Sequence, residues 1–226
     1  MKIAGIVPNS FVDYPGKIAA LVFTPGCNMN CWYCHNRHLL SSEAEKVLYN
    51  TRSILADLER KQGILDAVVL TGGEPTLQPG LLDFAREVKG LGFLVKLDTN
   101  GTKPEVIRSM LEQGLLDYIA MDIKAPFEKY EAVCKRPVPV ERVKESISLI
   151  LGAGIDYEFR TTFSPDLTQD DLVAIARSIQ GAKRYTLQQY RKTEYTPEIE
   201  PHPPAYVRDC AAKLAPLVCS VKVLGL

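Results

Sequence analysis

The chain has 226 residues, of which 46% are hydrophobic and 24% are charged, and its 27 basic side chains are balanced by 27 acidic ones. This length supports a core that needs no disulfide bonds, and the zero net charge disfavours a nucleic acid or an anionic membrane as partner. No uncharged apolar run approaches the ~18 residues of a membrane span and no signal-peptide pattern is present, so we expect a soluble protein of the cytoplasm.

Apolar, β-rich runs alternate with amphipathic segments, which is the pattern of a parallel α/β fold. The chain is predicted to begin with a strand at Lys2–Val7 and a turn at Asp13–Gly16, which folds back onto a strand at Ile18–Phe23. In chain order, the predicted elements that follow are helix Thr51–Gln62, strand Ala67–Leu70, helix Leu81–Lys89, strand Phe93–Leu97, helix Pro104–Gln113, strand Tyr118–Met121, helix Val140–Leu151, strand Tyr157–Thr162, helix Thr168–Ile179, strand Arg184–Gln188 and helix Pro204–Leu214.

One domain accounts for this order of elements. It has a strand and turn extension over residues 1–16, six βα units over 17–190, and a C-terminal helix and tail over 191–226. A complete eight-unit barrel typically needs ~250 residues, so we expect an α/β fold of the partial (β/α)6 TIM-like type, with an open parallel sheet as the alternative. Pro104 suits the first turn of its helix, and Thr102 is the predicted N-cap.

The sharpest motif is Cys27-Asn-Met-Asn-Cys31-Trp-Tyr-Cys34, directly after the strand at Ile18–Phe23. Without a sign of an oxidising compartment, clustered thiols indicate metal ligands. Iron–sulfur cubanes usually take four cysteines, so three on one loop suggest an iron reserved for a small molecule. The alternative is structural zinc, with His35 or His38 as the fourth ligand. Because Cys134, Cys210 and Cys219 are dispersed, we expect them to be buried thiols.

Three further motifs follow successive predicted strands: Thr71-Gly72-Gly73-Glu74-Pro75, Asp98-Thr99-Asn100-Gly101 and Met121-Asp122-Ile123-Lys124. Each alone is compatible with ordinary turn chemistry. The carboxyl ends of parallel strands form the binding face of such folds, so four polar motifs in four consecutive units indicate one site.

The cysteine run followed by Gly-Gly-Glu resembles the radical S-adenosylmethionine superfamily. More narrowly, the chain resembles the glycyl-radical-enzyme activases, and among them anaerobic ribonucleoside-triphosphate reductase activating proteins. The segments that carry this likeness are Ser10–Ala19, Thr24–Asn28 and Cys34–Asn36. The resemblance includes specific motifs from about residue 4 to residue 126. After residue 126 only the general sequence pattern is similar.

The resemblance implies a partial barrel of the radical SAM type, with one 4Fe–4S cluster on the catalytic residues Cys27, Cys31 and Cys34. It also implies S-adenosylmethionine on the open iron and a monovalent cation near Asp98 and Asp122. The cofactor-binding residues that it implies are Tyr33 beside the adenine, Gly72, Gly73 and Glu74 at the methionyl amine, and Asp98, Asn100, Asp122 and Lys124. The implied partners are a glycyl-radical enzyme, expected to be anaerobic ribonucleotide reductase, and flavodoxin or ferredoxin as electron donor.

The two later units depart from the pattern of pyruvate formate-lyase activase. Its Val-Pro-Gly segment is Phe163-Ser164-Pro165 here, and its sixth-strand histidine has no clear match in Leu187–Arg191. Arg160 is either a cofactor contact or an ion-pair partner. Three other functions stay open from the sequence: a pyruvate formate-lyase type of activase, a radical enzyme acting on a small molecule, and a zinc-binding module without catalysis.

Overall fold

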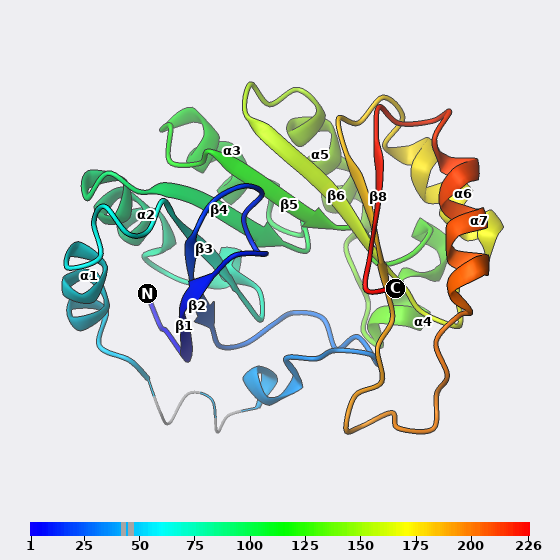
Figure 1. The fold of residues 1–226 in the computed structure, drawn as a ribbon, viewed down its shortest axis with the longest axis horizontal. Coiled ribbons are helices and arrows are strands. Elements are labelled where there is room, and N and C mark those ends of the chain that lie inside the picture. Colours follow the sequence, from blue (N-terminus) through cyan, green and yellow to red (C-terminus); the bar gives the residue numbers. More distant parts are fainter. Residues whose placement is uncertain (42–43, 45–47) are drawn as a thin grey trace.

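A single sheet of eight strands forms the centre of the computed structural model, which describes residues 1–41, 44 and 48–226 (Figure 1). The strands lie side by side in chain order. They are β1 (Gly5–Ser10), β2 (Ala19–Thr24), β3 (Ala67–Gly72), β4 (Leu94–Thr99), β5 (Tyr118–Asp122), β6 (Asp156–Phe163), β7 (Tyr185–Gln189) and β8 (Val221–Leu224). Only the pair β1–β2 is antiparallel among the pairings of these eight strands, and all the others are parallel.

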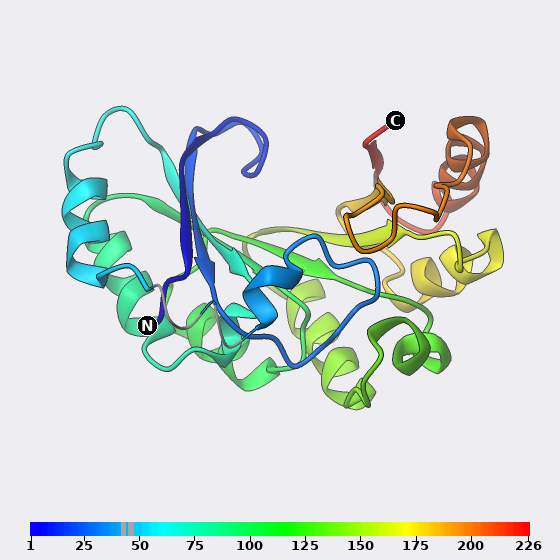
Figure 2. The same cartoon turned by 90° about the horizontal axis from the view of Figure 1, so that it is seen from below.

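Helices cover the outer face of this curved sheet, and none of the α-helices in the described residues lies over its inner face (Figure 2). They are α1 (Thr51–Glu59), α2 (Leu81–Gly90), α3 (Pro104–Glu112), α4 (Tyr130–Cys134), α5 (Val140–Leu151), α6 (Gln169–Ser178) and α7 (Pro204–Leu214). Short 3-10 turns lie at η1 (Arg37–Leu40), η3 (Pro75–Leu77) and η4 (Phe127–Lys129). The fold is therefore the partial α/β barrel that the sequence predicted, with a helix after each of the strands β2 to β7.

Local signals explain where the helices begin and which face they bury. The Asn50 side chain accepts hydrogen bonds from the first backbone N–H groups of α1, and Thr168 and Asp171 form a reciprocal capping box at α6. In α1, Ile54 and Leu58 lie one turn apart and are both buried against the sheet. The main core lies between the sheet and these helices.

A second, smaller apolar cluster lies on the inner face, formed by Tyr14, Ala19, Leu21, Ala67, Val69, Tyr118 and Ala120. Alternate residues of each strand point to opposite faces, so β2 and β3 contribute to both clusters. Tyr14 comes from the β1–β2 connection, and its ring lies 5.5 Å from that of Tyr118. The connection therefore folds over the inner face, where Figures 1 and 2 show it in dark blue.

The structure differs from the sequence-based expectations in several places. The strand β8 lies where only a helix and tail were expected, and the short helix α4 was not predicted. Thr102 is not the N-cap of α3, because that position is Lys103, and the Thr102 hydroxyl donates instead to the side-chain oxygen of Asn100. No helix in the described part of the chain is long and apolar enough to cross a bilayer.

Candidate functional site

The cysteine loop leaves the carboxyl end of β2 and is held against the end of β3 by backbone contacts. The Gly26 carbonyl accepts from the Glu74 amide at 2.8 Å, and the Gly26 amide donates to the Leu39 carbonyl at 2.8 Å. A Cβ on Gly73 would lie 1.9 Å from the Gly26 oxygen, and Gly72 has φ +121° with Thr24 backbone where its Cβ would be. Glycine is thus required at both positions for the two segments to meet.

The far side of the same loop rests on α4. Asn30 and Trp32 donate backbone hydrogen bonds to the carbonyls of Cys134 and Val133, at 2.9 and 3.4 Å. Cys134 and Cys210 are buried, as expected, whereas the expectation was wrong for Cys219, which is exposed near the C-terminal strand. The sulfur of Cys134 lies 3.6 Å from that of Met29. The fold therefore places a fourth thiol against the cysteine loop, a neighbour that sequence spacing of about a hundred residues could not reveal.

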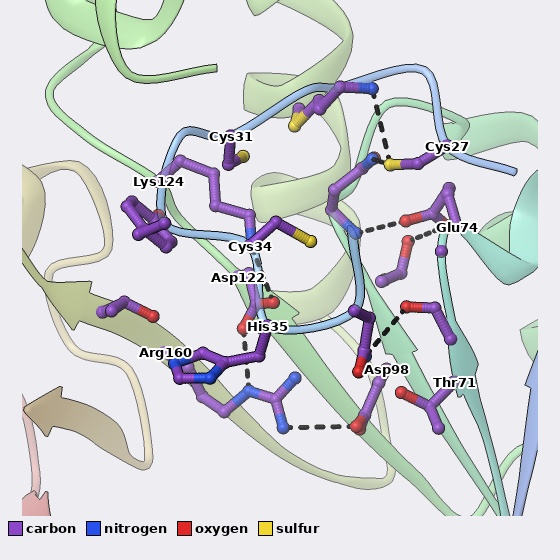
Figure 3. Close-up of a pocket in the computed structure, with 18 of the residues that line it drawn as sticks. Cys27, Cys31, Cys34, His35, Thr71, Glu74, Asp98, Asp122, Lys124 and Arg160 are labelled. Atoms are coloured by element: carbon purple, nitrogen blue, oxygen red, sulfur yellow. Dashed lines mark hydrogen bonds and ion pairs between the residues drawn. The ribbon is translucent and has the colours of Figure 1, made fainter. Parts of the chain in front are cut away.

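The three cysteines of the motif line a cavity of about 270 Å³ at the carboxyl ends of the strands, and their sulfurs point into the same space (Figure 3). Burial raises the pKa of Cys27 to about 12 and raises that of Cys34. Hydrogen bonding with Cys134 lowers the pKa of Cys31 to about 7 against the effect of burial. Cys31 thus approaches the thiolate form that binds iron, while the other two thiols release protons on metal binding.

The arrangement suits a cluster better than a single ion. Within the described residues, no three His, Cys, Asp or Glu side chains converge closely enough to hold one metal ion. Structural zinc needs four ligands around one point, whereas each cysteine of a cubane binds a different iron. Three thiols that line one cavity are compatible with a cubane, in which each cysteine would bind a different iron.

Glu74 is 1% exposed and is hydrogen bonded through both carboxylate oxygens. Its Oε1 accepts from the Thr76 amide at 3.1 Å, from the Thr76 hydroxyl at 2.5 Å and from the Thr99 hydroxyl at 2.7 Å, and its Oε2 accepts from the Asn100 amide at 2.7 Å. Burial raises the pKa of Glu74, and these four donors oppose the rise. The carboxylate thus joins the loop after β3 to the end of β4.

A chain of amides connects the third motif to the first cysteine. The Asn100 side-chain nitrogen lies 2.9 Å from the oxygen of Asn28 and 3.8 Å from the Cys27 sulfur. Asn28 in turn donates to the Thr102 hydroxyl at 2.8 Å. Asn100 therefore positions the cysteine loop through its side chain and Glu74 through its backbone.

Charged side chains from β4, β5 and β6 form the opposite wall of the cavity. Arg160 donates from Nε to Asp122 at 2.8 Å and from Nη1 to Asp98 at 3.3 Å, and Lys124 donates to the other Asp122 oxygen at 2.9 Å. Burial opposes ionisation of both carboxyls, but the neighbouring cations outweigh it and lower the pKa of each. Arg160 is thus an ion-pair partner of both carboxylates, and the monovalent cation expected near them stays a prediction.

Tyr33 lines the cavity and is almost fully buried, and its hydroxyl has no hydrogen-bond partner among the described residues. Buried hydroxyls are nearly always paired, so this atom has unused capacity for a ligand. The wall offers carboxylates and ammonium or guanidinium groups together, which matches a ligand with an amine and a carboxylate. The described residues therefore fit both a cubane on three thiolates and a zwitterionic ligand beside it.

All eleven predicted site residues line this one cavity: Cys27, Cys31, Tyr33, Cys34, Gly72, Gly73, Glu74, Asp98, Asn100, Asp122 and Lys124. The later units contribute Arg160, which the sequence left open between a cofactor contact and an ion-pair partner, and also Thr162 and Gln188. His35 also lines the cavity. Burial lowers the pKa of His35, so its neutral form is favoured.

Comparison with known proteins agrees with this geometry. Residues 21–179 match the model of the radical SAM superfamily. A Methanocaldococcus jannaschii protein, provisionally named as a glycyl-radical enzyme activating enzyme, is 37% identical over 213 residues, which cover 89% of this chain and 85% of that protein. A Saccharolobus solfataricus protein, provisionally named GTP 3′,8-cyclase, is 32% identical over 57% of this chain and 43% of its own length.

Solved structures show the same fold at low sequence identity. SuiB of Streptococcus suis, solved with S-adenosylmethionine bound, matches with a TM-score of 0.71 and 11% identity over 91% of this chain. The chain spans about half of the length of SuiB, at 52%. TYW1 with a lysine–pyruvate adduct matches with a TM-score of 0.62 and 16% identity over 88% of this chain.

Proposed function

The chain belongs to the radical SAM superfamily, and from that premise we propose that it is an activating enzyme that installs a glycyl radical on a partner enzyme. The observation that carries this proposal is the extent of one similarity. The match to the provisionally named activating enzyme covers 89% of this chain and 85% of that protein, whereas the cyclase match stops at 43% of the cyclase. The likeness to an activating enzyme thus includes the later units, where substrates differ between radical enzymes.

Cys27, Cys31 and Cys34 would hold a 4Fe–4S cluster, and the wall from Glu74 to Lys124 would hold S-adenosylmethionine. When bound, the cluster supplies one electron for reductive cleavage of S-adenosylmethionine, whose deoxyadenosyl fragment then takes a hydrogen atom from glycine. The protein supplies position, electrostatics and exclusion of water. The segment at Gly72 and Gly73 would receive the amine of S-adenosylmethionine, and Lys124 would pair with its carboxylate. Tyr33 would lie beside the adenine, where its buried ring would exclude water from the site.

The part of the cavity wall that β6 and β7 form favours a peptide substrate over a charged small molecule. Arg160 is already engaged by Asp98 and Asp122, and the other residues that β6 and β7 bring to the cavity are the uncharged Thr162 and Gln188. An extended peptide is recognised largely through its main chain, so it needs few charged side chains around it. A glycine in a mobile loop of another protein fits these requirements.

The same proposal includes the identity of the partner enzyme, the electron donor, the extent of the domain and the place of the protein in the cell. The motif over Ser10–Ala19 supports anaerobic ribonucleoside-triphosphate reductase as the partner, and a one-electron donor such as flavodoxin or ferredoxin would reduce the cluster. We assign the chain a single domain over residues 1–226 and a place in the cytoplasm.

The test is to mix the anaerobically reconstituted, reduced protein with S-adenosylmethionine and the anaerobic ribonucleotide reductase of the same organism. We expect a doublet signal in electron paramagnetic resonance, because the radical on glycine couples to the one hydrogen left on Cα. Methionine and 5′-deoxyadenosine should appear with it. Cofactor cleavage without the doublet would instead support a small-molecule substrate.

A further inference from the structure

Lys96 is a buried lysine that the proposed chemistry does not use. It lies in the middle of β4 and points to the inner face, with 2% of its side chain exposed. Burial of a lysine is costly unless its ammonium group is paired. Its partners therefore show which parts of the molecule the side chain connects.

Three groups surround the Lys96 ammonium group. Nζ donates to the backbone carbonyl of Asp13 at 2.6 Å and forms an ion pair with Oδ1 of Asp98 at 2.9 Å. The ring centroid of Tyr118 lies 5.6 Å away, within the range of a cation–π contact. Asp98 lines the cofactor cavity, whereas Asp13 belongs to the β1–β2 connection. One cation is thus shared between the cavity and that connection.

The β1–β2 connection is otherwise held at a few points. Tyr14 packs in the inner-face cluster, and the Lys17 amide closes a turn on the Tyr14 carbonyl at 3.2 Å. Its tip is open to solvent, with Phe11 74% and Val12 86% exposed. The Asp13 carbonyl is therefore a main anchor of a segment whose tip has little packing of its own, and Lys96 supplies that anchor.

We propose that Lys96 is a positioning residue that couples the β1–β2 connection to the S-adenosylmethionine pocket through Asp98, an inference that rests on the proposed cofactor. When a ligand group hydrogen bonds to Asp98, the Lys96 ammonium group divides its interactions differently between the Asp98 carboxylate and the Asp13 carbonyl. A coupling free energy of this kind is reciprocal, so a change in the connection must alter cofactor affinity by the same factor.

The first experiment measures amide hydrogen exchange in the reconstituted protein with and without S-adenosylmethionine. We expect the cofactor to slow exchange at residues 13–17, and Lys96→Met to make exchange there fast and independent of cofactor. Asp98→Asn should keep the connection protected and remove its response to cofactor. Lys61→Met is the matched control, because Lys61 also donates to a backbone carbonyl of this hairpin, that of Pro8 at 3.1 Å, but is only partly buried and does not pair with a residue of the cavity.

The second experiment tests reciprocity through a residue outside the cavity and needs no radical transfer. Tyr14→Ala should weaken S-adenosylmethionine binding about three- to tenfold in the wild-type background. In the Lys96→Met background the same substitution should leave the affinity unchanged. The four affinities form a double-mutant cycle and are measured by calorimetry. Unchanged exchange at residues 13–17 when cofactor binds, or additive effects of the two substitutions, would overturn the proposal. Failure to form a glycyl radical would leave these binding measurements unaffected and would count against the proposed function alone.

Discussion

Nε of Arg160 donates a 2.8 Å hydrogen bond to Oδ1 of Asp122, its direct neighbour in the register of β5 and β6. The same guanidinium reaches Asp98 on β4, so one side chain ties together three strands at the wall of the cavity. Two carboxylates that border one cavity repel each other unless a cation lies between them. In this chain the guanidinium group of Arg160 is such a cation, because it contacts both Asp98 and Asp122.

Replacing Arg160 by Met should therefore make cofactor binding depend on pH. In the wild type the pKa values of Asp98 and Asp122 are lowered, so both stay ionised and affinity for S-adenosylmethionine should be flat from about pH 7 to 5.5, below the range in which the ligand amine titrates. Without the guanidinium, both pKa values rise and affinity should fall as the pH is lowered through that range. Calorimetric titration at several pH values measures this, with the surface variant Arg86→Met as control. A flat profile in Arg160→Met would contradict the assignment.

The same substitution has a consequence for stability with a defined sign. A carboxyl whose pKa is lowered on folding stabilises the fold above its unfolded pKa, and this contribution is lost as the pH falls through the folded pKa. At pH 7 the wild type therefore has the whole contribution. Arg160→Met leaves two carboxylates without their shared partner and should lower the free energy of unfolding by roughly 3–5 kcal/mol, the usual cost of breaking a buried pair. Denaturant unfolding at pH 7 checks this value.

Glu74→Gln should mainly destabilise the loop after β3, and its effect on the chemistry of the bound cluster and S-adenosylmethionine should be smaller. The amide group of glutamine has one acceptor oxygen where the carboxylate has two, so at least one of the four donors loses its partner. We expect the free energy of unfolding to fall by about 1–3 kcal/mol. Glu112→Gln, at the exposed end of α3, serves as the control. Equal free energies of unfolding for Glu74→Gln and Glu112→Gln would show that the Glu74 carboxylate does not stabilise the loop after β3.

Iron content tests the assignment of the cysteines. Anaerobically reconstituted wild-type protein should contain about four irons per chain, and alanine at Cys27, Cys31 or Cys34 should prevent stable assembly. Cys134→Ala, Cys210→Ala and Cys219→Ala should keep the iron. The Cys134 variant is the informative one because that thiol adjoins the loop, yet no ligand role is needed for it. Full cluster assembly in Cys31→Ala would overturn the ligand set.

Asp98→Ala and Lys124→Ala should weaken binding of S-adenosylmethionine by about 1–3 kcal/mol each, the usual cost of losing a charged hydrogen bond. Their iron content should remain that of the wild type, because neither residue contacts the sulfurs of the motif by a hydrogen bond. Affinity measured by calorimetry and iron measured by absorption separate the two effects. Wild-type affinity in both variants would remove these residues from the cofactor site.

The sequence was sufficient for most of the fold because periodicity is local. The parallel strands from β2 to β7 were predicted within a few residues, and the polar motifs at their carboxyl ends all line one cavity. The strand β8 was missed because Val221–Leu224 is short, half exposed and interrupted by a lysine, like an ordinary tail.

The missed parts of the site depend on contacts between distant segments. Cys134 reaches the cysteine loop only because α4 packs beneath it, and the sequence gives no signal for that contact. Arg160 could have been placed, because alternation along β6 and its register with Asp122 put it on the inner face. What the sequence left open was whether it binds ligand or the two carboxylates.

The most direct measurement of the central claim follows a hydrogen atom. The partner enzyme is prepared with glycine deuterated at Cα, mixed anaerobically with the reduced protein and S-adenosylmethionine, and the 5′-deoxyadenosine is analysed by mass spectrometry. If this chain activates a glycyl-radical enzyme, deuterium must move from that glycine to the 5′ carbon, and a partner with alanine at the target position must give none. Deuterium-free 5′-deoxyadenosine formed in the presence of the labelled partner would contradict the account.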